Sequence, residues 1–498
     1  MPAFCSWRSV ARLHVWLAGV CLCLLAAAAR ADDKDRWYIL EMFGGKAGWM
    51  HTTQTTQGEN IVTASRMEFD LKRGQATVGM SMETEFVETA DGKPVSMRSL
   101  QNFGAMGLIQ NYTFGPEEVT ISSTQGGVDR TSKAKLPEGA WLTPAAAERY
   151  SLQRYKSGAK EIVVRTIDPA SGLTIVTAKR TGFEPTKIKA LGREIDAVMT
   201  SVEVSLMPNL KTVEYIDDAG ELIRSETNLG GLPVVMTVAT KEEAMAKGKS
   251  PEIMVQTFVK PDRAIPTARA STTATYFLSA SEGSLPAIPA TGSQIATPAE
   301  GGIRLTVNAS ESAPASEADA KDASYLAATA MCDAKDAKIV ELAGRAIKGA
   351  AGDAASRAEA VRSFVHSYIR TKNMDVGLAT ASEVARNRTG DCTEHGVLTA
   401  ALLRANGIPA RVVAGLLYVD EFGGAHNIFG YHMWAQALVE VDGKPRWVDF
   451  DATLPGRRFD ATHIALATSA MRDGESLGEL SAIAGAMGRL QIKVEEIK

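Results

Sequence analysis

Cysteine is scarce in this chain of 498 residues, which has five in all. Three of them, Cys5, Cys21 and Cys23, lie within the first 31 residues, so the body of the protein keeps only Cys332 and Cys392. This count leaves room for a single disulfide in an oxidising compartment. The other interpretation is that one of the two is a reactive thiol.

Clusters of basic residues and long apolar runs are also lacking. The formal net charge is −4, and no run of Lys and Arg stands out. Because phosphate binding needs clustered positive charge, we expect no nucleic-acid partner. Beyond the N-terminal region no apolar stretch approaches the ~20 residues of a membrane-spanning helix, so we expect no membrane span in the processed protein.

Several motifs of metal and nucleotide chemistry are absent. The sequence has no H-E-x-x-H, no cysteine pair at zinc spacing, no EF-hand loop and no G-x-x-x-x-G-K-[ST]. We therefore expect no metal and no cofactor.

What the chain does have is the composition of a globular protein, 45% hydrophobic and 22% charged. Its length is too great for one core. We divide it into a signal peptide (1–31), a β-rich N-terminal domain (32–250), a linker with a short β element (251–320) and a catalytic domain (321–498).

The first 31 residues are typical of a secretory signal peptide. Arg8 and Arg12 precede an apolar run, which ends in the small-residue sequence Ala29-Arg30-Ala31. An uncleaved anchor is the alternative, although the run is short for a membrane span. Cleavage after Ala31 removes three Arg and no acid, so the charge becomes 51 minus 58, or −7. We expect an exported protein, located in the periplasm of a bacterium.

Residues 37–240 alternate apolar and polar side chains in many short segments, such as EIVVRTI and KTVEYI. This period of two predicts half-buried antiparallel strands, and the turns TADGKP, DPASG and DDAGE separate them. We expect a large curved antiparallel sheet or open barrel that packs, presents a partner surface or holds an extended ligand. The Pro-, Ala- and Ser-rich region that follows is interrupted by two expected strands, TATYFLSA and GIRLTVNA.

From residue 320 the pattern favours an α+β domain. The segments KDAKIVELAGRAI and SRAEAVRSFVHSYI carry apolar residues at helical spacing. Strands are expected over 410–418, 432–441 and 446–450, so helices precede an antiparallel meander.

Between those helices and strands the chain reads RTGDCTEHGVL, with Cys392 among turn formers and charges. Asp391 and Glu394 have the spacing of a capping box, which predicts a helix that begins at Cys392 and ends at Asn406-Gly407. Unpaired N–H groups and the helix dipole favour a thiolate in this first turn. A Cys332–Cys392 disulfide is the competing hypothesis.

A reactive thiol needs an imidazole partner, and His432 is the strongest candidate. The hairpin signal Asp442-Gly443 follows it. With these two residues as the loop, Trp434 faces Asp451 on the neighbouring strand. Pro445 leaves the register open, because a three-residue loop would turn one strand over.

In that register His432 and Asp451 are diagonal neighbours on one face, ~7–8 Å apart between Cα atoms. Asp449 lies on the same face but ~13 Å away along the strand, so we prefer Asp451 as the carboxylate that orients the imidazole. Three other histidines are weaker candidates: His395 on the cysteine helix, His426 in a glycine-rich loop and His366 on a helix face.

Two segments carry a resemblance to a known family. They are GDCTEHGVLTAALLRANGIPARVVAGLLY and YHMWAQALVEVDGKPRWVDFDAT. They resemble the cysteine segment and the histidine and aspartate segments of the transglutaminase-like superfamily, over about residues 320–470. The resemblance implies a papain-like α+β domain with Cys392 as nucleophile, His432 as base and Asp451 as orienting acid. Ala452 stands where the family usually has proline.

The resemblance implies a thiol enzyme that breaks or transfers amide bonds of a peptide or protein through a Cys thioester. The signal-peptide pattern of residues 1–31 adds export, and from that location we expect a substrate in the bacterial cell envelope. The alternative is a catalytically silent scaffold in which the β-region binds a partner.

Overall fold

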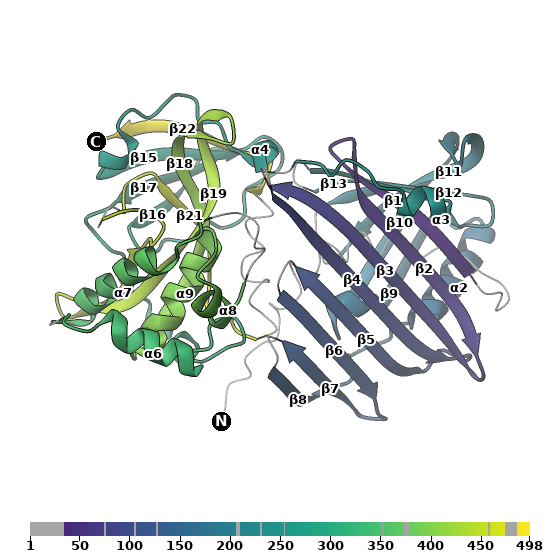
Figure 1. Ribbon diagram of the computed structural model, residues 1–498. Coiled ribbons are helices and arrows are strands. Elements are labelled where there is room, and N and C mark those ends of the chain that lie inside the picture. Colours follow the sequence, from purple (N-terminus) through teal and green to yellow (C-terminus); the bar gives the residue numbers. More distant parts are fainter. Residues whose placement is uncertain are drawn as a thin grey trace. The chain divides into compact units, whose positions relative to one another are not determined.

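The computed structural model describes residues 34–498, except 74–75, 104–105, 126–127, 206–209, 230–231, 253, 351, 373–378, 457–458 and 474–485. The expected signal peptide, residues 1–31, lies outside the described residues. The chain divides into two compact units, the first ending at Pro251 and the second covering Glu252–Lys498 (Figure 1). Within the described residues, no helix has both the length and the apolar character needed to cross a bilayer.

The first unit consists mainly of strands. Its strands are β1 Lys34–Met42, β2 Gly45–Gln57, β3 Asn60–Arg73, β4 Ala76–Thr89, β5 Pro94–Phe103, β6 Met106–Phe114, β7 Glu118–Gln125, β8 Val128–Lys135, β9 Glu161–Ile167, β10 Ile175–Ala190, β11 Arg193–Val204, β12 Lys211–Ile216, β13 Leu222–Leu229 and β14 Leu232–Ala239. Its helices are α2 Pro144–Lys156, the 3-10 turn η2 Pro169–Ser171 and α3 Lys241–Met245.

These strands form one sheet of fourteen, in the order β8-β7-β6-β5-β4-β3-β2-β1-β14-β13-β12-β11-β10-β9. Two meanders, β1–β8 and β9–β14, are joined by antiparallel pairing of β1 with β14. Alternation of buried and partly exposed side chains is clear in strands such as β9 and β12, as the period-two sequence pattern predicts. The expected large antiparallel β-region is therefore confirmed.

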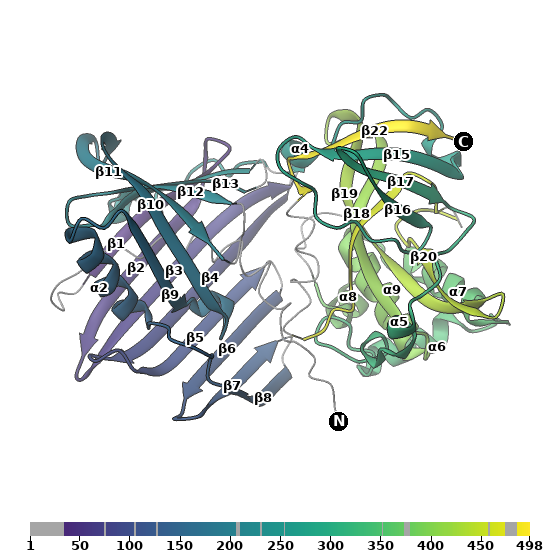
Figure 2. The same ribbon diagram turned by 180° about the vertical axis from the view of Figure 1, so that it is seen from behind.

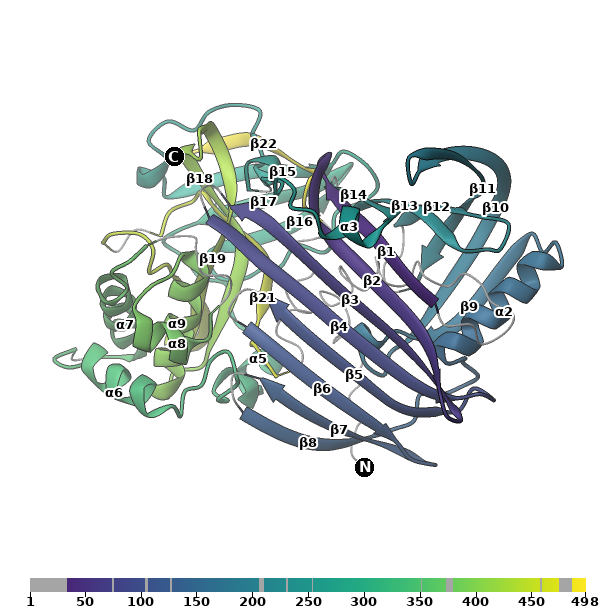
Figure 3. The same cartoon turned by 45° about the vertical axis from the view of Figure 1, so that its right-hand side comes forward.

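The sheet is strongly curved (Figure 3), and in Figure 2 strands β9 and β10 pass in front of β3 and β4. Phe86, Met97 and Tyr112, from β4, β5 and β6, share one apolar cluster with Ile167 of β9. Strands far apart in the sheet order thus bury the same core. Figure 2 shows helix α2 beside β9.

The second unit mixes helices and strands. Its strands are β15 Thr273–Ala280, β16 Gln294–Ala299, β17 Gly302–Asn308, β18 Ala410–Phe422, β19 Ala425–Val441, β20 Lys444–Phe450, β21 His463–Ser469 and β22 Leu490–Ile497. Its helices are α4 Met254–Thr257, η3 Ala268–Ala270, α5 Glu317–Lys321, η4 Ala323–Tyr325, α6 Ala337–Ala346, α7 Ala354–Tyr368, α8 Ala381–Asn387 and α9 Cys392–Ala405.

The strands of this unit make two four-stranded sheets, ordered β16-β17-β15-β22 and β20-β19-β18-β21. Side chains of both, including Tyr276, Leu305, Leu416 and Phe429, form a common apolar cluster. Helices α7 and α9 pack on the β18–β19 sheet, and α6 and α8 pack against α9 (Figures 1 and 2). The α+β prediction for this region is confirmed.

Residues 252–320 are part of the folded second unit. We expected a linker with a short β element over residues 251–320. The two expected strands are present as β15 and β17, and with β16 and β22 they build a sheet inside the second unit. Pro- and Ser-rich composition indicated turns correctly. It could not indicate that β15 pairs with a strand more than 200 residues later, because such pairing depends on non-local contacts.

Helix α9 lies at the centre of the second unit. Every residue from Glu394 to Arg404 is buried, which suits a helix with apolar and small residues on all sides. Gly396 permits its close approach to β19, because a Cβ there would lie 3.2 Å from Met433 Cγ. Cys392, at the start of this helix, is thus fixed against the strand that carries His432.

Candidate active site

Cys392 is the first residue of α9, as the capping-box pattern predicts. The Asp391 side chain accepts hydrogen bonds from first-turn N–H groups, including that of Thr393 at 2.8 Å. Glu394 Oε2 accepts from Asp391 N at 2.8 Å, and its Oε1 accepts from Ala379 N at 2.9 Å. Glu394 therefore fixes both the helix start and the preceding segment, which accounts for it without a catalytic role.

The two cysteines of the described chain are both free thiols. Cys332 is fully buried, and its Sγ lies 3.8 Å from the carbonyl oxygen of Val397. Cys392 is only partly buried. The structure therefore gives no support to the Cys332–Cys392 disulfide and leaves Cys392 as the more accessible thiol.

The hairpin between β19 and β20 has the predicted two-residue loop. Val441 pairs with Lys444, and Ala435 pairs with Phe450. Asp442 and Gly443 both have positive φ, 51° and 71°, as a type I′ turn requires. Pro445 does not shift the register.

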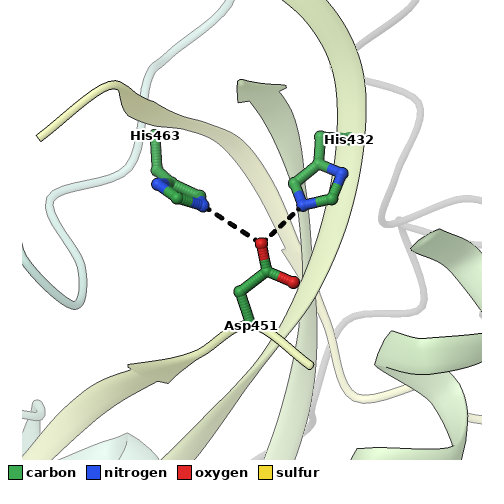
Figure 4. A group of neighbouring side chains, drawn as sticks. All are labelled: His432, Asp451 and His463. Atoms are coloured by element: carbon green, nitrogen blue, oxygen red, sulfur yellow. Dashed lines mark hydrogen bonds and ion pairs between the residues drawn. The ribbon is translucent and has the colours of Figure 1, made fainter. Parts of the chain in front are cut away.

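His432, on β19, and Asp451, directly after β20, are in contact. The Nε2 atom of His432 lies 2.8 Å from Oδ2 of Asp451 (Figure 4). The Asp451 side chain is buried, and that of His432 is 9% exposed. Burial alone would lower the pKa of His432, but the Asp451 carboxylate and a hydrogen bond with Cys392 raise it to about 9. The imidazolium opposes the burial effect on Asp451 in turn, so the pKa of this carboxyl is well below its usual value.

The start of α9, strand β19 and the residue that follows β20 thus bring together Cys392, His432 and Asp451. Since Nε2 of His432 is engaged by the carboxylate, Nδ1 is the ring nitrogen left for the thiol. A thiol, an imidazole and a buried carboxylate in this order are the groups of a Cys–His–Asp acyl-transfer site.

Asp449 does not face His432. It pairs with Gln436 in the ladder, as the register predicts. Its Oδ1 accepts from the indole of Trp434 at 2.8 Å and from the Gln436 amide at 2.7 Å. Its Oδ2 accepts from the N–H and hydroxyl of Ser293. Asp449 is a structural carboxylate.

The weaker histidine candidates have other partners. His395 donates from Nδ1 to the carbonyl of Asp391 in its own helix cap, at 2.6 Å, and burial lowers its pKa. His366 Nδ1 lies 3.0 Å from the carbonyl of Ala452. The His426 side chain is 63% exposed. None of the three has a described contact with the thiol.

His463, the first residue of β21, is a site residue that sequence reasoning missed. Its Nε2 lies 3.2 Å from the same Asp451 Oδ2 that binds His432 (Figure 4). The ring is fully buried and stacks on Phe459 at 4.0 Å between centroids.

A signal for His463 was present in the sequence as a repeat of D-A-T. Asp451 Oδ1 accepts from the N–H and the hydroxyl of Thr453, at 2.8 and 2.6 Å. Asp460 Oδ1 accepts in the same way from Thr462, at 2.9 and 2.5 Å. His463 follows the second copy directly, so two identical turns present the two carboxylates that flank it.

Two histidines and an aspartate are residue types that bind metal ions, and the potential ligand atoms of His432, Asp451 and His463 lie within 4.8 Å of one another. Each imidazole already uses its Nε2 on the carboxylate. A metal ion would have to replace both hydrogen bonds in a site whose side chains are buried. We assign the cluster to hydrogen-bond and proton chemistry.

Residues 341–452 match the model of the transglutaminase-like superfamily. No curated protein matches the chain. Similar solved structures include a β-barrel-like protein of a domain of unknown function from Brucella abortus, with 11% identity, a TM-score of 0.33 and coverage of 43% of this chain and 98% of that one. A proposed cysteine protease from Cytophaga hutchinsonii has 17% identity, a TM-score of 0.26 and coverage of 45% and 86%.

A proposed protease from Parabacteroides distasonis has 12% identity, a TM-score of 0.19 and coverage of 72% and 69%. All three TM-scores are below 0.5, so function has to be argued from the site itself. The family match covers the cysteine, the histidine and the aspartate. The chain thus contains a transglutaminase-like domain in its second unit.

Proposed function

We propose that this protein is an exported thiol enzyme of amide and acyl-transfer chemistry, with a peptide or protein of the bacterial cell envelope as substrate. One observation carries the proposal. His432 contacts both Asp451, at 2.8 Å, and the partly accessible Cys392 at a helix start. Export to the periplasm is proposed from the sequence of residues 1–31.

In the first step Nδ1 of His432 takes the proton of the Cys392 thiol, and the thiolate attacks the carbonyl carbon of the amide. The oxyanion that forms needs donors. Because the N–H of a first-turn residue has no acceptor within its helix, that of Cys392 is free to supply one hydrogen bond.

In the second step the His432 imidazolium gives its proton to the leaving amine, the C–N bond breaks, and a thioester remains on Cys392. Water or a second amine then attacks the thioester, with His432 as base, and releases the thiol. The two outcomes are hydrolysis and transfer. Asp451 keeps the imidazole in one orientation and tautomer throughout.

The test is the pH dependence of iodoacetamide alkylation in reduced, processed protein, followed by mass spectrometry. Fast labelling of Cys392 well below pH 8 is expected, and His432→Ala should slow it at pH 6 by at least about tenfold, or about 1.4 kcal/mol. His426→Ala, at an exposed histidine, is the control variant. The fully buried Cys332 is an internal reference that should stay unlabelled.

The proposal would be refuted if Cys392 is labelled slowly, if its rate rises only near the pKa of an ordinary thiol, and if His432→Ala shows the same profile. The remaining interpretation would then be the catalytically silent scaffold. A Cys392→Ala protein that keeps its cellular role would point the same way.

A further inference from the structure

His463 has hydrogen-bond acceptors at both ring nitrogens. Its Nδ1 lies 3.0 Å from the carbonyl oxygen of Asp460, and its Nε2 lies 3.2 Å from Asp451 Oδ2. A carbonyl oxygen can only accept, and an ionised carboxylate can only accept. Both nitrogens must therefore carry hydrogen, and the ring is an imidazolium.

The surroundings of His463 favour a buried cation. The Asp460 carboxylate lies 3.5 Å from Nδ1 and forms an ion pair at 2.8 Å with Arg269. Charges therefore alternate in sign along Arg269, Asp460, His463, Asp451 and His432. Burial alone would lower the pKa of His463, but its hydrogen bonds and the charges of Asp451 and Asp460 raise it to about 9.

We propose that His463 is a positioning residue that, as a permanent buried imidazolium, keeps Asp451 ionised and directs its Oδ2 toward His432. This inference rests on the proposed function, since Asp451 matters only if His432 serves Cys392. It extends the site from three residues, the cysteine included, to four, with Asp460 and Arg269 holding the fourth.

The chemistry explains why a cation is needed. A buried carboxylate tends to take up a proton, and a protonated Asp451 could no longer stabilise a second imidazolium on His432. The Thr453 bonds fix only Oδ1. His463 supplies both the second donor to Oδ2 and the charge that opposes protonation.

The direct test is nitrogen NMR of the full chain labelled with ¹⁵N-histidine. The His463 signals, assigned by comparison with His463→Gln, should both have imidazolium shifts at pH 7.5. They should do so in Cys392→Ala as well, so this arm does not depend on catalysis. A neutral His463 ring at this pH would overturn the inference, whatever the reactivity of Cys392.

The second arm is the pH profile of Cys392 alkylation in His463→Gln, His463→Phe and the control His426→Gln. The Gln amide keeps a hydrogen-bond donor but carries no charge, so Asp451 should protonate at higher pH. The acid limb, meaning the low-pH side of the plot of alkylation rate against pH, should therefore move to higher pH by about one unit or more. Phe should move the limb at least as far, and His426→Gln should not move it.

An acid limb in His463→Gln that coincides with that of the unchanged protein would overturn the inference, because a packing or hydrogen-bond role alone predicts that result. Slow labelling in the unchanged protein would instead refute the proposed function, and the NMR arm would still decide the charge of His463. The two failures are therefore distinguishable.

Discussion

Asp451 accepts four hydrogen bonds, two on each oxygen. His432 and His463 donate to Oδ2, and the N–H and hydroxyl of Thr453 donate to Oδ1. A carboxylate with this many donors has one orientation and is held in its ionised form, which agrees with its lowered pKa.

At the residue scale, Asp451→Asn should weaken the activation of Cys392. Burial lowers the pKa of His432 and the Asp451 charge outweighs it, so removal of that charge should lower the pKa from about 9. The imidazolium then survives over a narrower pH range and stabilises the thiolate less. We expect the acid limb of Cys392 alkylation to move up, with a loss of at least about tenfold in rate at pH 6.

Asp449→Asn is the matched control, two residues away on the same hairpin. Its carboxylate is bonded to Trp434, Gln436 and Ser293, so the variant should lose about 1–3 kcal/mol of stability. Its alkylation profile should keep the acid limb of the unchanged protein. Equal shifts in the two variants would mean that Asp451 has no specific link to the thiol.

At the element scale, the position of the thiol depends on how α9 begins. Gly390 lies against the capping residue: a Cβ there would be 2.2 Å from Glu394 Cβ and 2.4 Å from its Cγ. At the other end Gly407, with φ of +73°, faces open space. The two glycines bound the same helix but have different constraints.

Gly390→Ala should displace Glu394, open the capping box and misplace Cys392. We expect a loss of about 1–3 kcal/mol in stability and a fall of about tenfold or more in alkylation rate at pH 6. Gly407→Ala should cost about 1 kcal/mol through backbone strain and leave the rate unchanged. Thermal unfolding and the alkylation assay measure both; an equally fast Gly390→Ala protein would contradict this account.

The elements show which parts of the site could be predicted from sequence. The α9 start and the β19–β20 hairpin depend on residues within a few positions of one another, so the capping box and the Asp442-Gly443 turn predicted both. His463 lies twelve residues after Asp451 and on β21, which is separated from β19 by β18. The position of His463 depends on the chain crossing from β20 to the far side of β18, where β21 pairs. It also depends on a bulge at Gly415, where only a residue without Cβ fits against the Ile464 carbonyl. The D-A-T repeat marks the two carboxylate turns, but local patterns carry no information on the crossing that brings them together.

At the scale of the whole molecule, the segment before the family match is part of the second unit. Gln294 bonds both the N–H and the carbonyl of Ala465 through its amide, at 2.8 and 2.9 Å. Thr291 bonds Gln436 at 3.0 Å. Arg269 forms the ion pair with Asp460. Residues 252–320 thus support β19 and β21 from outside the matched region.

A fragment of residues 252–498 should therefore fold, with a cooperative thermal transition and the Cys392 reactivity of the full chain. A fragment of residues 321–498, the domain expected from sequence, should aggregate or lack a transition, because β22 loses β15 and Asp460 loses Arg269. Circular dichroism and alkylation would test both. A stable, reactive 321–498 fragment would show that the earlier strands are dispensable.

The pairing of β15 with β22 decides when this unit can fold. Thr272 N donates to the Lys498 carbonyl at 2.7 Å, and Lys498 N donates to the Thr273 carbonyl at 2.9 Å. Strand β22 also contributes Leu490, Ile492 and Val494 to the apolar cluster that both sheets share. The sheet and this core therefore stay incomplete until β15 and β22 are both present. During synthesis, the thiol unit can complete its fold only after its last strand has emerged.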